Sequence, residues 1–110
     1  MHVDVLHDTV VNSPAEPEAC AYPFTTLTRK GEIVCVYRRG KDKHSTDGIF
    51  VAQRSIDNGL NWGRPIVIFD GRLSKPGESV GAGGICTAAD GVLVALFCTL
   101  EVGTDAYCFS

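Results

Sequence analysis

The segment Ser55-Ile56-Asp57-Asn58-Gly59-Leu60-Asn61-Trp62 decides how this chain is expected to fold. It lies between Ile49 to Ser55 and Pro65 to Phe69, two short runs rich in apolar β-branched and aromatic residues, which predict strands. The Asn-Gly pair at its centre is typical of a tight hairpin turn, in which the backbone needs positive φ. The segment therefore predicts a β-hairpin.

Two further apolar runs, Tyr22 to Thr28 and Ile33 to Arg38, precede this hairpin and are separated by turn residues 29–32. The second run alternates with apolar residues on both faces, which indicates an interior strand. One face carries Ile33, Cys35 and Tyr37, and the other carries Val34 and Val36. No window of helical length keeps a 3.6-residue period, so we expect an all-β fold.

The sequence also repeats. Thr28 to Tyr37 matches Ala88 to Phe97 at an offset of 60, with glycine on glycine and aromatic on aromatic. Ser55 then matches Ser110 at an offset of 55, so the last residue would begin a second turn of the same kind. Propeller folds repeat one four-stranded blade with a period of roughly 40 to 50 residues, and the repeat here is somewhat longer.

The turn and the repeat together resemble sialidase-like six-bladed β-propellers. Their Asp box reads S-x-D-x-G-x-T-W, and Ser55, Asp57, Gly59 and Trp62 match it, with Asn61 in place of the usual Thr. The resemblance implies antiparallel four-stranded blades, of which about one and three-quarters are expected here. It divides the chain into an N-terminal strand and loop (1–18), a first blade with the Asp box (19–71) and a truncated second blade (72–110).

Candidate functional residues gather in the loop Arg39 to Gly48, which has no apolar residue. In an antiparallel blade this loop and the connection 71–84 share one rim, and the Asp box lies on the other. The resemblance implies that Asp47 is the catalytic general acid and base. It also makes the loop a substrate-binding rim, for which we take Arg38, Arg39 and His44. A solvated charge run without function is the alternative.

Other features of the resemblance do not decide whether the chain takes part in catalysis. The Asp box is expected to be structural, with Ser55 and Asp57 satisfying turn amides and Trp62 packing. The family's opening F/Y-R-I-P motif has an arginine where this chain has Ala21, and its nucleophilic tyrosine and partner glutamate come from later blades. The expected function is therefore part of a sialidase-like glycoside hydrolase or related carbohydrate-active propeller, inactive alone. A non-catalytic carbohydrate- or protein-binding propeller is the alternative.

Composition limits the partners. The 110 residues carry 13 Asp and Glu against 10 Lys and Arg, a net charge of -3 without a basic stripe, so neither nucleic acid nor membrane is expected. The longest apolar run, Gly91 to Leu100, is too short for a spanning helix, and no signal peptide is recognised. We expect a cytoplasmic protein whose partners are a carbohydrate or glycoconjugate, and the remaining blades or further copies at exposed strand edges.

The five cysteines are odd in number and include no C-x-x-C pair, so neither a metal nor another cofactor is expected. Most are expected to be free, with a bridge between Cys98 and Cys108 as the alternative. The glycines within Ser79 to Gly84 do not fit a phosphate-binding pattern, and we interpret them as a flexible crossover.

Overall fold

The computed structural model describes residues 9–12, 18–42, 45–73, 78–101 and 107–109. In this part of the chain the only helical element is the 3-10 turn η1 (Gly71–Leu73), and all other regular elements are β-strands. None of its helices has the length and apolar character needed to cross a lipid bilayer. The predicted all-β fold is confirmed.

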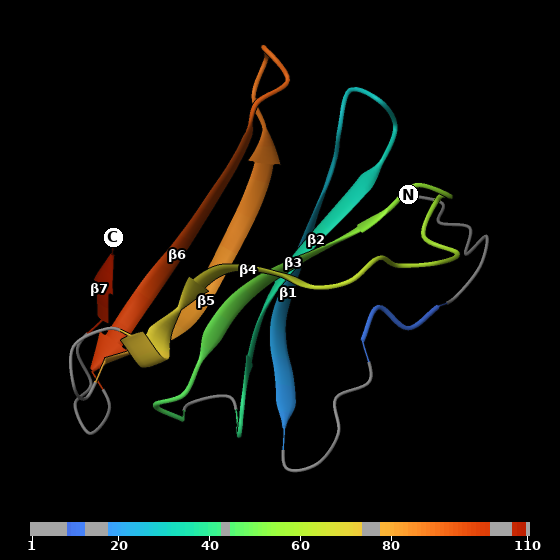
Figure 1. Ribbon diagram of the computed structural model, residues 1–110. Helices are drawn as coiled ribbons and strands as arrows, with labels where there is room; N and C mark the ends of the chain where they lie inside the picture. Colours follow the sequence, from blue (N-terminus) through green and yellow to red (C-terminus); the bar gives the residue numbers. More distant parts are fainter. Residues whose placement is uncertain (1–8, 13–17, 43–44, 74–77, 102–106, 110) are drawn as a thin grey trace, which may run out of the picture.

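The first sheet contains β1 (Ala19–Leu27), β2 (Ile33–Gly40), β3 (Ile49–Ser55) and β4 (Ile66–Asp70). The strands lie in chain order, and each is antiparallel to the one before it (Figure 1). The four-stranded antiparallel unit predicted from the sequence is therefore present, with β2 in its interior as expected.

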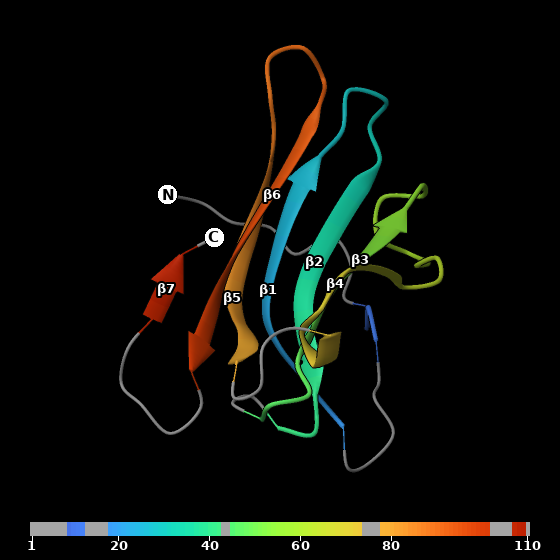
Figure 2. The same cartoon turned by 60° about the vertical axis from the view of Figure 1, so that its left-hand side comes forward.

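The second sheet contains β5 (Glu78–Thr87), β6 (Leu93–Glu101) and β7 (Tyr107–Phe109), again in chain order. Its first strand, β5, runs beside β1, as both views show (Figures 1 and 2). Residues 1–8, with the expected opening strand, and Ser110, with the expected start of a second Asp box, lie outside the described residues.

The interpretation of Ser79 to Gly84 as a flexible crossover is wrong, because these residues belong to β5, and all of them except Gly81 and Ala82 pair with β6. Close packing explains one of these glycines. A Cβ on Gly83 would lie 2.5 Å from the Leu96 carbonyl oxygen and 2.7 Å from the Phe50 ring. Gly83 therefore allows the second sheet to approach the first, and backbone pairing stabilises a stretch that looks like a loop in sequence.

Apolar side chains fill the space between the two sheets. Val36, Phe50 and Val80 are fully buried there. The Phe97 ring from β6 lies 5.4 Å from the Phe50 ring and 4.8 Å from the Phe69 ring, centroid to centroid. The opposite face of the first sheet carries a second cluster, centred on Cys35, Tyr37 and Val51.

The sequence repeat corresponds to a structural repeat of two hairpins. Gly31 and Gly91 have φ of +83° and +88°, and each turn is closed by the same pair of backbone bonds. The first strand of each sheet also carries a register shift, between Ala21 and Phe24 in β1 and, within one residue of the matching place, between Val80 and Gly83 in β5. Two units of the same local design therefore follow each other along the chain.

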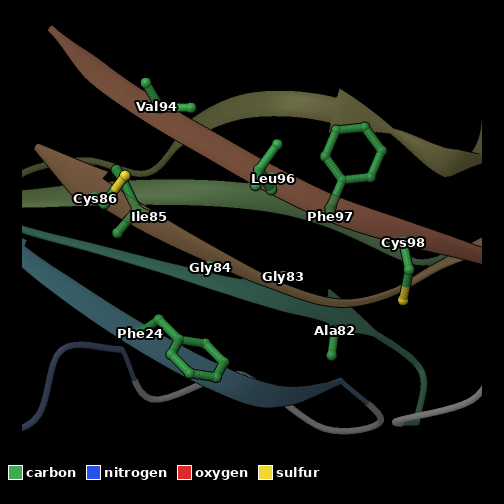
Figure 3. A pocket seen from close by; sticks show the side chains of 10 residues that line it. All are labelled: Phe24, Ala82, Gly83, Gly84, Ile85, Cys86, Val94, Leu96, Phe97 and Cys98. Atoms are coloured by element: carbon green, nitrogen blue, oxygen red, sulfur yellow. The ribbon is translucent and has the colours of Figure 1, made fainter. Parts of the chain in front are cut away.

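One face of the second sheet is apolar and open. A hollow of about 810 Å³ lies along β5 and β6 (Figure 3). Leu96, on this face, is 64% exposed, whereas Val36, its counterpart in the sequence repeat, is 0% exposed because the second sheet covers it.

Among the described cysteines, Cys20, Cys35, Cys86 and Cys98 are free, so the alternative of a Cys98 bridge is wrong.

Candidate functional site

The turn between β3 and β4 contains Ser55 to Trp62, the segment in which the sequence predicts an Asp box. Asn58 and Gly59 have φ of +60° and +85°, as the Asn-Gly pair predicts. The buried Ser55 hydroxyl accepts the Gly59 N–H at 2.8 Å and donates to the Asp57 carboxylate at 2.8 Å. The Asp57 carboxylate accepts the backbone N–H of Asn61 at 2.9 Å and its side-chain amide at 2.8 Å.

These bonds have an electrostatic consequence. The amide and hydroxyl donors of Asn61 and Ser55 stabilise the carboxylate and lower the pKa of Asp57 to about 2. Trp62 is half-buried against the Cys35 cluster, and its buried indole nitrogen has no hydrogen-bond partner among the described residues. Thus the polar atoms of Ser55 and Asp57 are used within the turn, as a structural role requires.

The loop between β2 and β3 contains Asp47, the predicted catalytic residue. Its two carboxylate oxygens lie 3.1 and 3.2 Å from the backbone nitrogen of Lys41, and the Ser45 hydroxyl donates to one of them. Burial alone would raise the pKa of Asp47, but the Ser45 hydroxyl and the Lys41 N–H lower it below its usual value. The group is therefore an ionised carboxylate near neutral pH.

Arg38, predicted to bind substrate, lies inside the protein with an exposed fraction of 1%. Its guanidinium donates to the carbonyl oxygens of Asp42 and Ser45 in the loop and to the Val80 carbonyl oxygen at 2.6 Å. Burial lowers the pKa of Arg38, and the nearby Asp47 and Asp42 oppose that shift. Its role in direct substrate contact stays a prediction, and the burial does not favour it.

The end of the loop is held by residues from later in the chain. The buried Ser79 hydroxyl donates to the Ser45 carbonyl oxygen at 2.6 Å and accepts the Gly48 N–H at 3.3 Å. Gly71 donates its N–H to the Gly48 carbonyl oxygen at 2.9 Å. Asp47 therefore sits where the β2–β3 loop, η1 and the start of β5 meet, which brings together the two connections predicted to share a rim.

The other predicted binding residues are not gathered as closely. Arg39 is partly exposed and lies 3.5 Å from the Glu18 carboxylate. His44 lies outside the described residues. Ala21, where the resemblance expects an arginine, pairs with Arg38 across β1 and β2. Among the described residues of this rim, Lys41, Asp42 and Thr46 are exposed, whereas Arg39 and Asp47 are partly buried.

Sequence reasoning missed two residues of this region, Ser45 and Ser79. A signal for the first was available, because Ser45-Thr46-Asp47 has the same Ser-X-Asp spacing as Ser55-Ile56-Asp57. No comparable signal marks Ser79, whose partners are more than 30 positions away.

A second polar cluster lies on the opposite face of the first sheet. The Tyr37 hydroxyl donates to the Gln53 side chain, and the Asn12 amide donates to the Tyr37 oxygen at 2.8 Å. Burial raises the pKa of Tyr37, so its phenol stays protonated and unreactive as a nucleophile. A cavity of about 210 Å³ beside it is lined mostly by apolar groups. Tyr37 therefore packs inside the protein with Cys35, on the face of β2 where the alternation of the sequence places both residues.

Comparison with models of known protein families finds no match to this chain, and comparison with curated proteins finds no significant relative.

Proposed function

We propose that this chain forms part of a sialidase-like β-propeller that acts on or binds carbohydrate, with the rim around Asp47 as its contact surface. The observation that carries the proposal is the complete hydrogen-bonded turn from Ser55 to Trp62 between the third and fourth strands of a four-stranded antiparallel sheet. The matching hairpins and irregularities of β1–β2 and β5–β6 support two successive blades.

The groups on the rim are suited to sugar hydroxyls. Lys41 provides an exposed cationic donor, with Arg39, which also contacts Glu18, as a second, and the partly exposed carboxylate of Asp47 provides an acceptor beside its bonds to Ser45 and Lys41. Hydroxyl-rich ligands are bound by such alternating donors and acceptors, whereas the apolar cavity near Tyr37 offers few polar groups.

A non-catalytic role is the second candidate, and the state of Asp47 favours it. A general acid must carry a proton before it reacts, whereas hydrogen bonds from Ser45 and Lys41 lower the pKa of this carboxyl group. Both of its oxygens are also engaged by the loop itself. Asp47 is then an anchor of the binding loop, and the catalytic role implied by the resemblance would require a change in its contacts.

Sugar titrations followed by amide NMR test the proposal. The 110-residue chain is titrated separately with N-acetylneuraminic acid, galactose and glucose, and we expect weak binding, with Kd of about 1 mM. Shifts should centre on residues 39–48 and weaken at least about tenfold in Asp47→Asn. Asp90→Asn is the matched control, because this exposed carboxylate lies in the β5–β6 turn.

The outcomes separate the candidates. Absence of shifts with all three sugars, or equal binding by Asp47→Asn and the wild type, would contradict the proposed contact surface. Hydrolysis of fluorogenic glycosides by the purified chain would favour catalysis over binding alone. We expect no turnover, because a glycosidase needs groups on both sides of the scissile bond and this rim supplies one side.

A further inference from the structure

The contacts of Arg38 come from two parts of the molecule that are far apart in sequence. Two of its acceptors, the carbonyl oxygens of Asp42 and Ser45, belong to the β2–β3 loop. The other two, the Val80 carbonyl oxygen at 2.6 Å and the Ser79 hydroxyl at 3.2 Å, belong to β5 in the second sheet. One side chain therefore bridges the loop of the first sheet and the first strand of the second.

The site around this guanidinium is closely fitted. A Cβ on Gly40 would lie 2.9 Å from one terminal nitrogen of Arg38, and a Cβ on Gly48 would lie 2.7 Å from the other. The glycines at both ends of the loop thus leave room for the planar group. Arginine presents its donors in a fixed fork, whereas lysine presents a compact point charge, so the two are not equivalent here.

Ser79 connects the same parts in a second way. Its hydroxyl donates to the Ser45 carbonyl oxygen, accepts the Gly48 N–H and accepts one N–H of Arg38. All three of these groups belong to the first sheet or its loop, although Ser79 belongs to β5. The polar bridge continues directly into the apolar interface, where Val80 packs with Val36 and Phe50.

We infer that Arg38 is a positioning residue that holds the β2–β3 loop by joining it to β5, so that the loop conformation depends on the packing of the two sheets. The coupling is reciprocal: a change in the sheet interface alters the loop, and a change in the loop alters the interface. Asp47 is then presented in its observed position only when the sheets are docked. The inference does not depend on sugar binding, and its test uses no sugar.

Hydrogen exchange of the 110-residue chain, followed by mass spectrometry, tests this coupling. In Arg38→Lys, amides of residues 40–48 and 78–80 should exchange at least about tenfold faster, because both segments lose their shared anchor. The turns at 28–32 and 55–62 should keep their rates. Arg39→Lys is the matched control, since the same chemical change at this partly exposed neighbour removes no contact with β5.

Two milder variants keep the test decisive if Arg38→Lys does not fold. Ser79→Ala removes the second bridge, and Gly83→Ala disturbs the sheet interface without touching the loop. Each should speed exchange in residues 40–48. Rates within about twofold of wild type in that segment for both variants, or equal acceleration in all strands, would overturn the inference. Failure of the sugar titrations would leave these expectations unchanged.

Discussion

Two Ser-X-Asp segments, Ser45 to Asp47 and Ser55 to Asp57, flank β3 at its opposite ends, and they are held in different ways. In each, the serine hydroxyl donates to the aspartate. Asp57 then bonds forward to Asn61, within one tight hairpin. Asp47 bonds backward to Lys41, across a longer loop. The same short pattern thus closes two turns of different size.

The difference lies in what supports each turn. The turn from Ser55 to Trp62 is closed mainly by its own residues and is a local structure. The loop at Asp47 also needs Arg38 and Ser79, and Ser79 comes from the second sheet. A local turn can be recognised from a short motif, whereas a loop held from outside can change when its support changes. We therefore expect the loop at Asp47, rather than the turn at Asp57, to change its conformation when its surroundings change.

The largest expected effect is that of Arg38→Met on the supported loop. Removing the guanidinium leaves buried carbonyl oxygens without donors, which should lower the free energy of unfolding by about 3 to 5 kcal/mol. Urea denaturation followed by Trp62 fluorescence measures this change. A loss below about 1 kcal/mol would show that water or other groups replace the donors and that the loop needs no such support.

Ser55→Ala should have the next largest effect, at the local turn. The buried N–H of Gly59 loses its acceptor, and unfolding should become easier by about 1 to 3 kcal/mol. The same urea experiment measures it, with Thr25→Ala, which removes an exposed hydroxyl from β1, as a control. Hydrogen exchange in residues 40–48 should stay at the wild-type rate. Faster exchange there would contradict the independence of the two turns.

Two glycine variants, one in the turn at Asp57 and one in the loop at Asp47, should each have a modest effect on stability and distinguish the two segments. Gly59→Ala places a side chain at a φ of +85°, which should cost about 1 to 2 kcal/mol through backbone strain. Gly48→Ala should cost a similar amount, about 1 to 3 kcal/mol, through overpacking against Arg38 and Ser79. Thermal melts give the sizes. Only Gly48→Ala should alter hydrogen exchange in β5, and the reverse pattern would contradict the assignment.

The smallest effect is confined to acid. The folded-state pKa of Asp57 is about 2, below its usual value of 3.8, so the unfolded chain binds more protons between these values. This contribution to stability is complete above the usual pKa and is lost as the pH falls through about 2. Urea midpoints at about pH 6 and about pH 3 should therefore differ less for Asp57→Asn than for the wild type. Equal differences would show that Asp57 is not stabilised in the turn.

The sequence predicts well what depends on neighbouring residues. The Asn-Gly turn, the interior position of β2 and the repeated hairpins all follow from local pattern and alternation, and the structure contains them. The strand Ser79 to Gly84 was not predictable in this way, because its glycines suit a loop and only pairing with β6 decides otherwise.

The position of Arg38 could be predicted only in part from the sequence. Alternation along β2 places Arg38 on the same face as Val34 and Val36, so its inward direction could have been predicted. Its acceptors on β5 could not, since they depend on how two sheets meet. The role expected for Asp47 rests on the family resemblance, and the geometry adds the contacts that hold it.

The open apolar face of β5 and β6 has a consequence for symmetry. The two sheets of this protein meet through different faces, so their contact is heterologous. If a further sheet covered the exposed Leu96 in the same manner, the equivalent face of that sheet would in turn be uncovered. Contacts of this heterologous kind cannot be completed by a twofold axis, and they end only when the row of sheets closes into a ring.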